Sequence, residues 1–174
     1  METQLTSPSV DLAETYREFL ADLRRHGEKP VPFVLGLKAP SFAELVRRLE
    51  GYSQGIAINA GFVPHSTFWL VDGDRKLVGV SNLRHELTPS LMREGGHIGF
   101  GVRPSERGQG YATRLLALTL LEAKKRGIDR ALLTCDRDNV ASAKVIEKNG
   151  GLFDSELTSD DGRCTKRFWI DVSC

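Results

Sequence analysis

Residues 97–116, HIGFGVRPSERGQGYATRLL, contain four glycines and three arginines and lead from a strand-like run into a helix-like run. Apolar and small residues alternate up to Val102, which is typical of a strand, whereas the leucines after Gly110 recur at helical spacing. A glycine-rich turn at the start of a helix presents free backbone N–H groups, and the helix dipole favours negative charge there. This stretch therefore predicts a binding site for an anion such as phosphate.

Three kinds of phosphate-binding loop contain glycines after a strand. A P-loop requires Gly-Lys-Ser/Thr, which does not follow these glycines. A dinucleotide fingerprint could be placed on Gly108 and Gly110, but its third position would be Thr113, and no ribose-binding acidic residue is evident. The remaining pattern is Arg-x-x-Gly-x-Ala, matched by Arg107, Gly110 and Ala112. We expect this third pattern to hold the anion.

The elements around the loop follow from periodicity. Amphipathic helices are predicted over 11–26, with Asp11 and Glu14 at capping-box spacing, and from Ser41 to Gly51 with a second capping box. The expected later elements are a hairpin of 67–71 with 77–83, a strand at 130–135, a helix at 139–151 and a hairpin of 151–157 with 166–172. This order indicates an α+β fold with a mixed, mostly antiparallel sheet and about four helices.

The composition limits the class of protein. With 174 residues, the chain fits one domain, residues 1–174. Its 24 basic and 23 acidic residues give a net charge of +1, which favours neither nucleic acid nor an anionic membrane as a partner. Three cysteines without CxxC spacing predict reduced thiols and no metal site. Without a signal pattern or a membrane-spanning apolar run, we expect a cytoplasmic protein, for which a homodimer is conceivable.

In these motifs the sequence resembles the GNAT superfamily of acyl-CoA-dependent N-acyltransferases. The resemblance covers roughly residues 67–153, the expected cofactor core, and the phrases GGHIGFGVRPSERGQGYAT and NVASAKVIEKNGG are similar to a poorly characterised branch of predicted acetyltransferases. It implies a single GNAT-like domain that moves an acetyl group from acetyl-CoA to a primary amine by direct attack, without a metal. The expected partner is an amine-bearing acceptor, for which a small molecule is favoured over a protein, while a peptide N-terminus and a lysine side chain stay open.

The resemblance also implies roles for individual residues. The loop would wrap the CoA pyrophosphate, the preceding strand would bind the pantetheine arm, and an asparagine that opens the next helix would touch the cofactor while capping that helix. On this strand, bare Gly99 and Gly101 are expected to leave room on one face. The implied cofactor-binding residues are Phe100, Gly101, Val102, Arg107, Gly108, Gln109, Gly110, Tyr111, Ala112, Asn139 and Ser142.

Two positions bear on the mechanism. His97 stands where many relatives carry a glutamate that deprotonates the amine, so the resemblance implies a catalytic base; the alternative is a buried histidine that only packs. A base of pKa about 6.5 would help, because an alkyl amine of pKa about 10.4 is mostly protonated at neutral pH. Ile146 occupies the place where relatives often have a tyrosine as general acid, so no dedicated acid is evident.

Two other functions remain open from the sequence. The missing tyrosine makes an acyl-CoA-binding sensor or scaffold without turnover the first alternative. A nucleotide-binding regulatory module is the second, because a glycine loop at a helix start suits any phosphate. The identity of the amine is not encoded in any motif, since one fold supports many acceptors.

Overall fold

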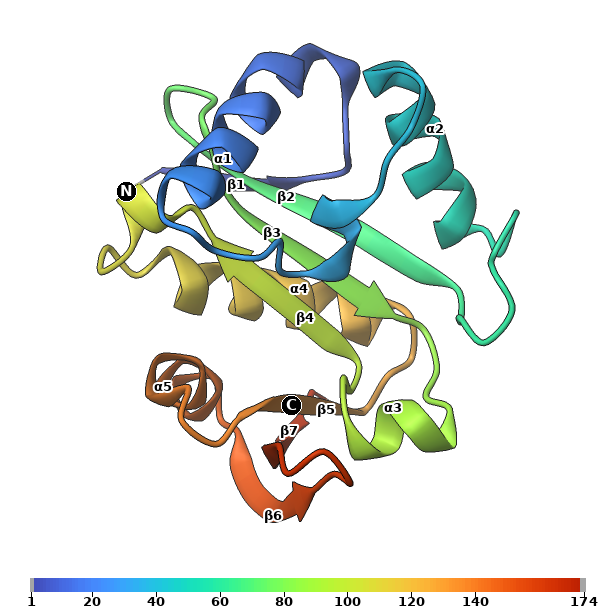
Figure 1. The fold of residues 1–174 in the computed structure, drawn as a ribbon, viewed down its shortest axis with the longest axis vertical. Helices are drawn as coiled ribbons and strands as arrows, with labels where there is room; N and C mark the ends of the chain where they lie inside the picture. Colours follow the sequence, from blue (N-terminus) through green and yellow to red (C-terminus); the bar gives the residue numbers. More distant parts are fainter. Residues whose placement is uncertain (1, 173–174) are drawn as a thin grey trace.

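The structure is a computed structural model that describes residues 2–172, in which the strands form two antiparallel sheets (Figure 1). One sheet has the order β1-β2-β3-β4 and the other the order β5-β7-β6. The strands are β1 (Thr3–Thr6), β2 (His65–Asp72), β3 (Leu77–Arg84), β4 (Ile98–Val102), β5 (Arg130–Asp136), β6 (Leu152–Thr158) and β7 (Cys164–Asp171). The α-helices are α1 (Ala13–Arg25), α2 (Phe42–Ser53), α3 (Pro89–Arg93), α4 (Tyr111–Lys125) and α5 (Val140–Lys148).

Helices cover both faces of the four-stranded sheet. α1 and α2 lie over one face, and α4 lies over the other (Figure 1). On α1, the buried side chains of Tyr16, Phe19 and Leu23 form the apolar stripe that helical spacing predicts, and they pack with Trp69 of β2. Within residues 2–172, no helix is both long and apolar enough to cross a membrane.

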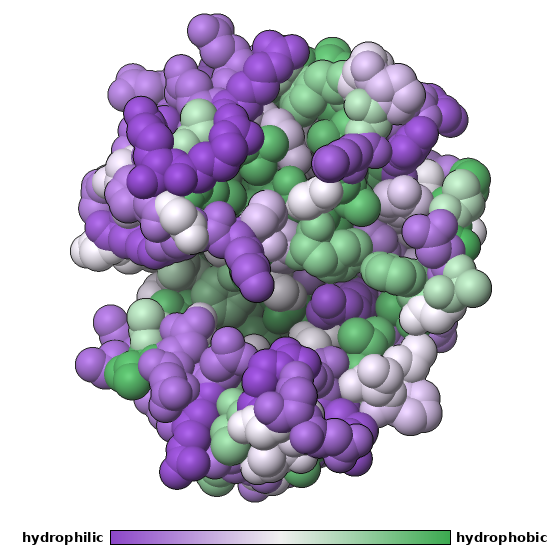
Figure 2. Space-filling view, viewed as in Figure 1, coloured by the Kyte–Doolittle hydropathy of each residue, from purple (hydrophilic) through white to green (hydrophobic). Residues whose placement is uncertain are grey.

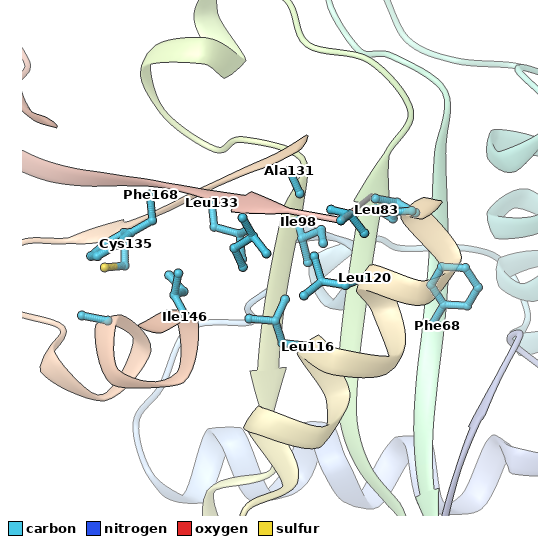
Figure 3. Packing of buried hydrophobic residues seen from close by; sticks show 14 residues of the cluster. Phe68, Leu83, Ile98, Leu116, Leu120, Ala131, Leu133, Cys135, Ile146 and Phe168 are labelled. Atoms are coloured by element: carbon cyan, nitrogen blue, oxygen red, sulfur yellow. The ribbon is translucent and has the colours of Figure 1, made fainter. Parts of the chain in front are cut away.

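A second apolar cluster holds the two sheets together (Figure 3). Leu83 and Ile98 come from the first sheet, Leu133 and Phe168 come from the second, and Leu116 of α4 belongs to the same buried group. Full burial of a side chain of this size stabilises a protein by about 1.5–3 kcal/mol. Packing on α4 therefore fixes β4 beside β5, although no ladder joins these two strands in the described chain.

β4 and β5 meet at one point and then separate. At that point the backbone N–H of His97 donates to Leu132 O at 2.7 Å, and the backbone N–H of Leu132 donates to the His97 ring Nδ1 at 2.9 Å. A Cβ on Gly96 would lie 2.4 Å from Leu132 O, so only glycine allows this approach. Beyond His97, β4 pairs with β3 and β5 pairs with β7. The result is a wedge between β4 and β5 with its vertex at His97.

The predicted α+β class is confirmed, and the predicted elements agree with the observed ones except at their ends. In place of one mixed sheet there are two antiparallel sheets, because β4 and β5 separate beyond His97. The Ser41 cap forms, because its Oγ accepts the Glu44 N–H at 3.1 Å. The capping box at Asp11 is wrong: Asp11 lies in a 3₁₀ turn, Val10–Leu12, and α1 begins after it without a side-chain cap. α2 also continues two residues past Gly51, the predicted stop, because glycine is tolerated inside a helix at a modest cost.

Two short elements were not predicted. β1 is an edge strand of four residues, too short for a period to be visible, and it forms by pairing with β2. α3 is one turn of helix with Thr88 as its cap and no buried side chain, so it has no apolar stripe to reveal it. Both elements depend on tertiary pairing or capping rather than on periodicity.

Candidate active site

A cleft of about 560 Å³ lies at the open end of the wedge. Figure 2 shows it as a hollow with apolar side chains in its depth. The α1–α2 connection, β4, the loop before α4, and α5 form its walls. Its lining residues are Leu23, Glu28, Lys29, Val31, Phe100, Val102, Glu106, Arg107, Gly108, Gly110, Tyr111, Ala112, Thr113, Asn139, Ala141, Ser142, Lys144, Val145 and Lys148.

The glycine loop opens directly into this cleft. Gly108 and Gly110 have φ angles of +79° and +84°, which glycine adopts without strain, and a Cβ on either would meet no atom within 4 Å. Gly110 is the N-cap of α4 and supplies no side-chain cap. The first-turn N–H groups of a 15-residue helix are therefore left for an anion in the cleft.

Most of the predicted cofactor residues come together at the cleft. Asn139, the N-cap of α5, and Ser142 lie across it, and Asn139 Oδ1 accepts the Ser142 N–H at 3.0 Å. Gln109 does not line the cleft and donates to Glu106 at 2.9 Å. The predicted residues that line it are Phe100, Val102, Arg107, Gly108, Gly110, Tyr111, Ala112, Asn139 and Ser142.

The expected free space beside Gly99 and Gly101 is absent. A Cβ on Gly101 would lie 2.1 Å from Val31 O, and a Cβ on Gly99 would lie 3.4 Å from Pro32 Cβ. The expectation was wrong because residues 31–32 of the chain itself cover this face. Glycine at 101 is required by the approach of another segment, and that segment comes from a part of the sequence that carries no recognisable motif.

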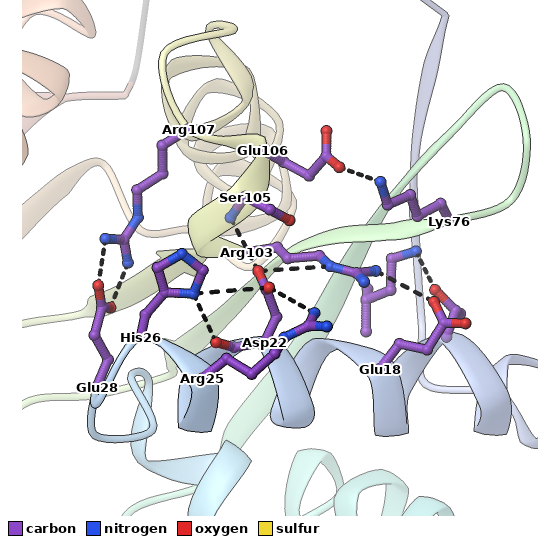
Figure 4. Close-up of polar contacts among 12 residues, drawn as sticks. Glu18, Asp22, Arg25, His26, Glu28, Lys76, Arg103, Ser105, Glu106 and Arg107 are labelled. Atoms are coloured by element: carbon purple, nitrogen blue, oxygen red, sulfur yellow. Dashed lines mark hydrogen bonds and ion pairs between the residues drawn. The ribbon is translucent and has the colours of Figure 1, made fainter.

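The charged side chain of Arg107 is already paired. Its two terminal nitrogens donate to the two carboxylate oxygens of Glu28, each at 2.6 Å (Figure 4). The hydrogen bond from Arg107 lowers the pKa of Glu28, so the carboxylate is charged at neutral pH. Both side chains line the cleft. Sequence reasoning missed Glu28, because it lies 79 positions before Arg107 in a polar stretch without periodicity.

α1 also holds the start of the loop. Asp22 is almost completely buried, accepts the Ser105 N–H at 2.9 Å and pairs with Arg25 at 2.8 Å (Figure 4). Burial opposes the ionisation of Asp22, but these hydrogen bonds outweigh it and lower its pKa to about 2. Glu106 forms an ion pair with Lys76. The loop is thus positioned by charges from α1 and from the β2–β3 turn.

His97 lies at the vertex of the wedge and not among the residues that line the cleft. Burial, followed by the charge of Arg84, lowers the pKa of its ring to about 4. The ring is therefore neutral at pH 7, and because Nδ1 accepts the Leu132 N–H, Nε2 carries the proton. In this arrangement His97 offers a hydrogen-bond donor. Action as a base through Nδ1 requires the bond to Leu132 to open.

The position at which relatives often carry a tyrosine is closed to the cleft. Ile146 is completely buried in the cluster between the sheets. A Cβ on Gly151 would lie 2.4 Å from Ile146 Cγ2, so the following glycine packs tightly on this side chain. Within residues 2–172, no group of three or more His, Cys, Asp or Glu side chains is arranged to hold a metal ion.

Comparisons with known proteins agree with this architecture. A search of curated protein sequences gave no match. Among solved structures, the chain is similar to RimL, a ribosomal L7/L12 alpha-N-protein acetyltransferase in complex with coenzyme A, with 15% identity, coverage of 98% of this chain and 94% of that one, and a TM-score of 0.70. An N-acetyltransferase from Staphylococcus aureus Mu50 gives 16% identity, 99% coverage of both chains and a TM-score of 0.65.

A dodecameric spermidine N-acetyltransferase from Vibrio cholerae is similar over 98% of this chain and 94% of that one, with 18% identity and a TM-score of 0.64. At these identities the likeness concerns the fold alone. The sequence model of the Acetyltransferase (GNAT) family matches residues 15–151, most of the chain. The protein is therefore a member of the GNAT family of acetyltransferases.

Proposed function

We propose that the protein transfers the acetyl group of acetyl-CoA to the primary amine of a small molecule. The observation that carries this proposal is the glycine loop at the start of α4, which opens into the 560 Å³ cleft beside the wedge. Structural relatives whose names specify spermidine or a ribosomal protein as acceptor indicate that the fold itself decides neither class. The volume of the cleft suits the cofactor, and the buried vertex at His97 suits a small acceptor better than a docked protein.

The residues of the cleft fit a pyrophosphate-containing cofactor. Space is open at Gly108 and Gly110, where backbone N–H groups can approach phosphate closely. Four basic side chains (Lys29, Arg107, Lys144 and Lys148) and two acidic ones (Glu28 and Glu106) line the cleft, a balance that favours a polyanion. We assign the pyrophosphate to residues 107–112, the pantetheine arm to β4 at residues 100–102, and the opposite wall to Asn139 and Ser142.

When bound, acetyl-CoA would supply the acetyl group as a thioester. The amine nitrogen would bond to the carbonyl carbon as the carbon–sulfur bond breaks, and the proton that the amine loses would balance the one that the sulfur gains to become a thiol. The chain's part is to hold the reacting atoms near the vertex and to exclude water from them. Backbone N–H groups on the edge of β4 that does not pair with β3 are suitable donors to the thioester oxygen.

His97 is our candidate catalytic residue at this vertex. Two roles are open to it: accepting a proton from the amine, directly or through water, or donating a hydrogen bond through Nε2. The bond from Leu132 to Nδ1 and the pKa of about 4 favour the donor role in the arrangement observed. In that case the amine proton leaves through water. The His97→Gln variant separates the two roles, as set out in the Discussion, because glutamine keeps an N–H donor but cannot act as a base.

The test of the proposed function measures cofactor binding and turnover separately. A ligand that binds only the folded protein raises its melting temperature, so acetyl-CoA should do so. Release of free thiol is then followed with a panel of primary amines. Binding with thiol release that depends on the amine supports the proposal. Binding of acetyl-CoA without any thiol release supports a sensor or scaffold. If acetyl-CoA does not bind, the assignment of the cleft to the cofactor is wrong.

A further inference from the structure

Three polar side chains form a row across the first sheet. His65 of β2 lies opposite Arg84 of β3, and the Arg84 backbone N–H donates to His97 O at 2.8 Å. Side chains at directly opposite positions of neighbouring strands share one face. Ser81 and Leu83 of β3 point to α4, so the row His65, Arg84 and His97 faces the α1–α2 connection instead.

Arg84 has no carboxylate to balance its charge. Its Nη1 donates to Gly95 O at 3.1 Å and to Gly96 O at 3.0 Å, and its guanidinium lies 5.7 Å from the centre of the Phe33 ring. Among residues 2–172, no acidic side chain forms an ion pair with Arg84, and its Nε and Nη2 are not among the buried polar atoms that lack a partner, so a ligand can reach them. A half-buried cation in this state is costly, which distinguishes Arg84 from the paired Arg103 and Arg107.

The surroundings of Arg84 supply no compensating negative charge. Burial and the charge of Arg84 both lower the pKa of His65 to about 4, as they do for His97, so both neighbours are neutral at pH 7. Tyr52 and Phe33 pack on the His65 ring, with ring centres 5.1 and 5.3 Å apart. The row therefore forms a positively charged site with aromatic neighbours, and it lies beside the vertex where we propose that the amine reacts.

We propose that Arg84 binds a carboxylate of the acceptor, so that the substrate is an amine that also carries a carboxylate, such as an amino acid. This inference rests on the proposed acetyl transfer and adds the class of its substrate. A guanidinium with two free nitrogens matches the two oxygens of a carboxylate, and the pairing would neutralise the charge that the fold leaves open. A polyamine, by contrast, would bring further positive charge to Arg84 and be disfavoured.

The experiment compares each amino acid of a panel with its own amide and with the amine that lacks the carboxyl carbon. For the parent protein, thiol release should favour the best amino acid over its amide by about 10- to 100-fold in kcat/KM, since a hydrogen-bonded charge pair is lost in the amide. In Arg84→Gln this preference should fall to about one. Arg84→Lys, which keeps the charge without the paired geometry, should give an intermediate preference.

If no compound of the panel is acetylated, the role of Arg84 is tested by equilibrium binding of the same panel to the CoA-loaded protein. At least one amino acid should bind more tightly than its amide, and this difference should be lost in Arg84→Gln. The inference is overturned if amides bind or react as well as amino acids, or if folded Arg84→Gln keeps the parental preference. If Arg84→Gln does not fold, Arg84→Lys takes its place, and a parental preference in folded Arg84→Lys overturns the inference.

Arg93→Gln is the matched control, because it removes the same charge from an exposed position on the neighbouring α3. It should keep the parental preference. The melting temperature with and without acetyl-CoA is recorded for every variant. A failure of cofactor binding contradicts the proposed function, whereas intact cofactor binding without a carboxylate preference contradicts only the role of Arg84.

Discussion

The two ends of the wedge between β4 and β5 differ in how their charges are balanced. At the open end, each charged side chain of the loop has a partner: Arg107 pairs with Glu28, Glu106 with Lys76, and Arg103 with Glu18. At the closed end, Arg84 has no acidic partner in the described chain, and the histidines beside it are neutral. One end is held in place by ion pairs, and the other lacks a negative charge.

This difference indicates how each end meets its ligand. An anion that enters the open end competes with Glu28 for Arg107, so binding there includes the opening of an existing pair. An anion that reaches the closed end finds a cation that has two carbonyl groups and an aromatic ring as neighbours but no carboxylate. We therefore expect cofactor affinity to depend on backbone geometry more than on the Arg107 charge, and acceptor affinity to depend strongly on charge.

The largest effect should come from Gly110→Val. A branched side chain at φ +84° strains the backbone and fills the space in front of the first turn of α4. The loss of two or more charge-assisted hydrogen bonds to phosphate should weaken acetyl-CoA binding by about 10³-fold, as measured by calorimetry.

Gly127→Val is the control for this change, because Gly127 lies just beyond the other end of α4, has φ +75° and also has open space around it. Both variants should lose a similar stability, about 1–2 kcal/mol. If the two variants bind acetyl-CoA equally well, the glycine loop does not hold the cofactor, and the description of the open end is wrong.

The next effect concerns His97 at the closed end. His97→Ala should lower turnover by about 10²-fold while acetyl-CoA affinity stays near the parental value. His97→Gln, which retains an N–H donor, should recover part of the loss if donation through Nε2 is what matters.

The dependence of the rate on pH reports the protonation state of His97. With a ring pKa of about 4, His97 stays neutral above that pH, so between pH 5 and 9 the parental rate should follow only the ionisation of the acceptor amine. An ascending limb near pH 6.5 that disappears in His97→Ala would contradict the lowered pKa and support a base that titrates near its ordinary value, as the sequence predicts.

A smaller effect is expected from Glu28→Gln. Without its carboxylate, Arg107 becomes available to the pyrophosphate, and acetyl-CoA should bind about 3- to 10-fold more tightly, the range that corresponds to a partly exposed ion pair. Glu14→Gln, which removes an exposed carboxylate from the other end of α1, should leave the affinity unchanged. Weaker binding in Glu28→Gln would mean that Glu28 orients Arg107 for the cofactor rather than competing for it.

The open end could be predicted from the sequence because its parts are contiguous. Arg107, Gly110 and Ala112 lie within six positions, and a loop with positive φ angles between a strand and a helix leaves a signature in local residue types. The same holds for the helices with apolar stripes and for the Asn139 cap. Such features are fixed by neighbours along the chain.

The closed end could not be predicted, because three strands and a connecting segment build it from distant residues. The pairing of His65 with Arg84 depends on strand register, which single-sequence periodicity does not give. The position of Val31 over Gly101 depends on how the α1–α2 connection packs. His97 was singled out by its place before the loop, but its contact with Leu132 arises only where the two sheets meet.

The central claim is tested most directly with acetyl-CoA that carries an isotopic label in its acetyl group. The protein is incubated with this donor and with the panel of amino acids and amides, and the amine products are analysed by mass spectrometry. The account predicts that the label appears on the nitrogen of a carboxylate-bearing amine, at a rate that Gly110→Val and His97→Ala reduce. Label that stays in the thioester, although acetyl-CoA binds in the cleft, would contradict it.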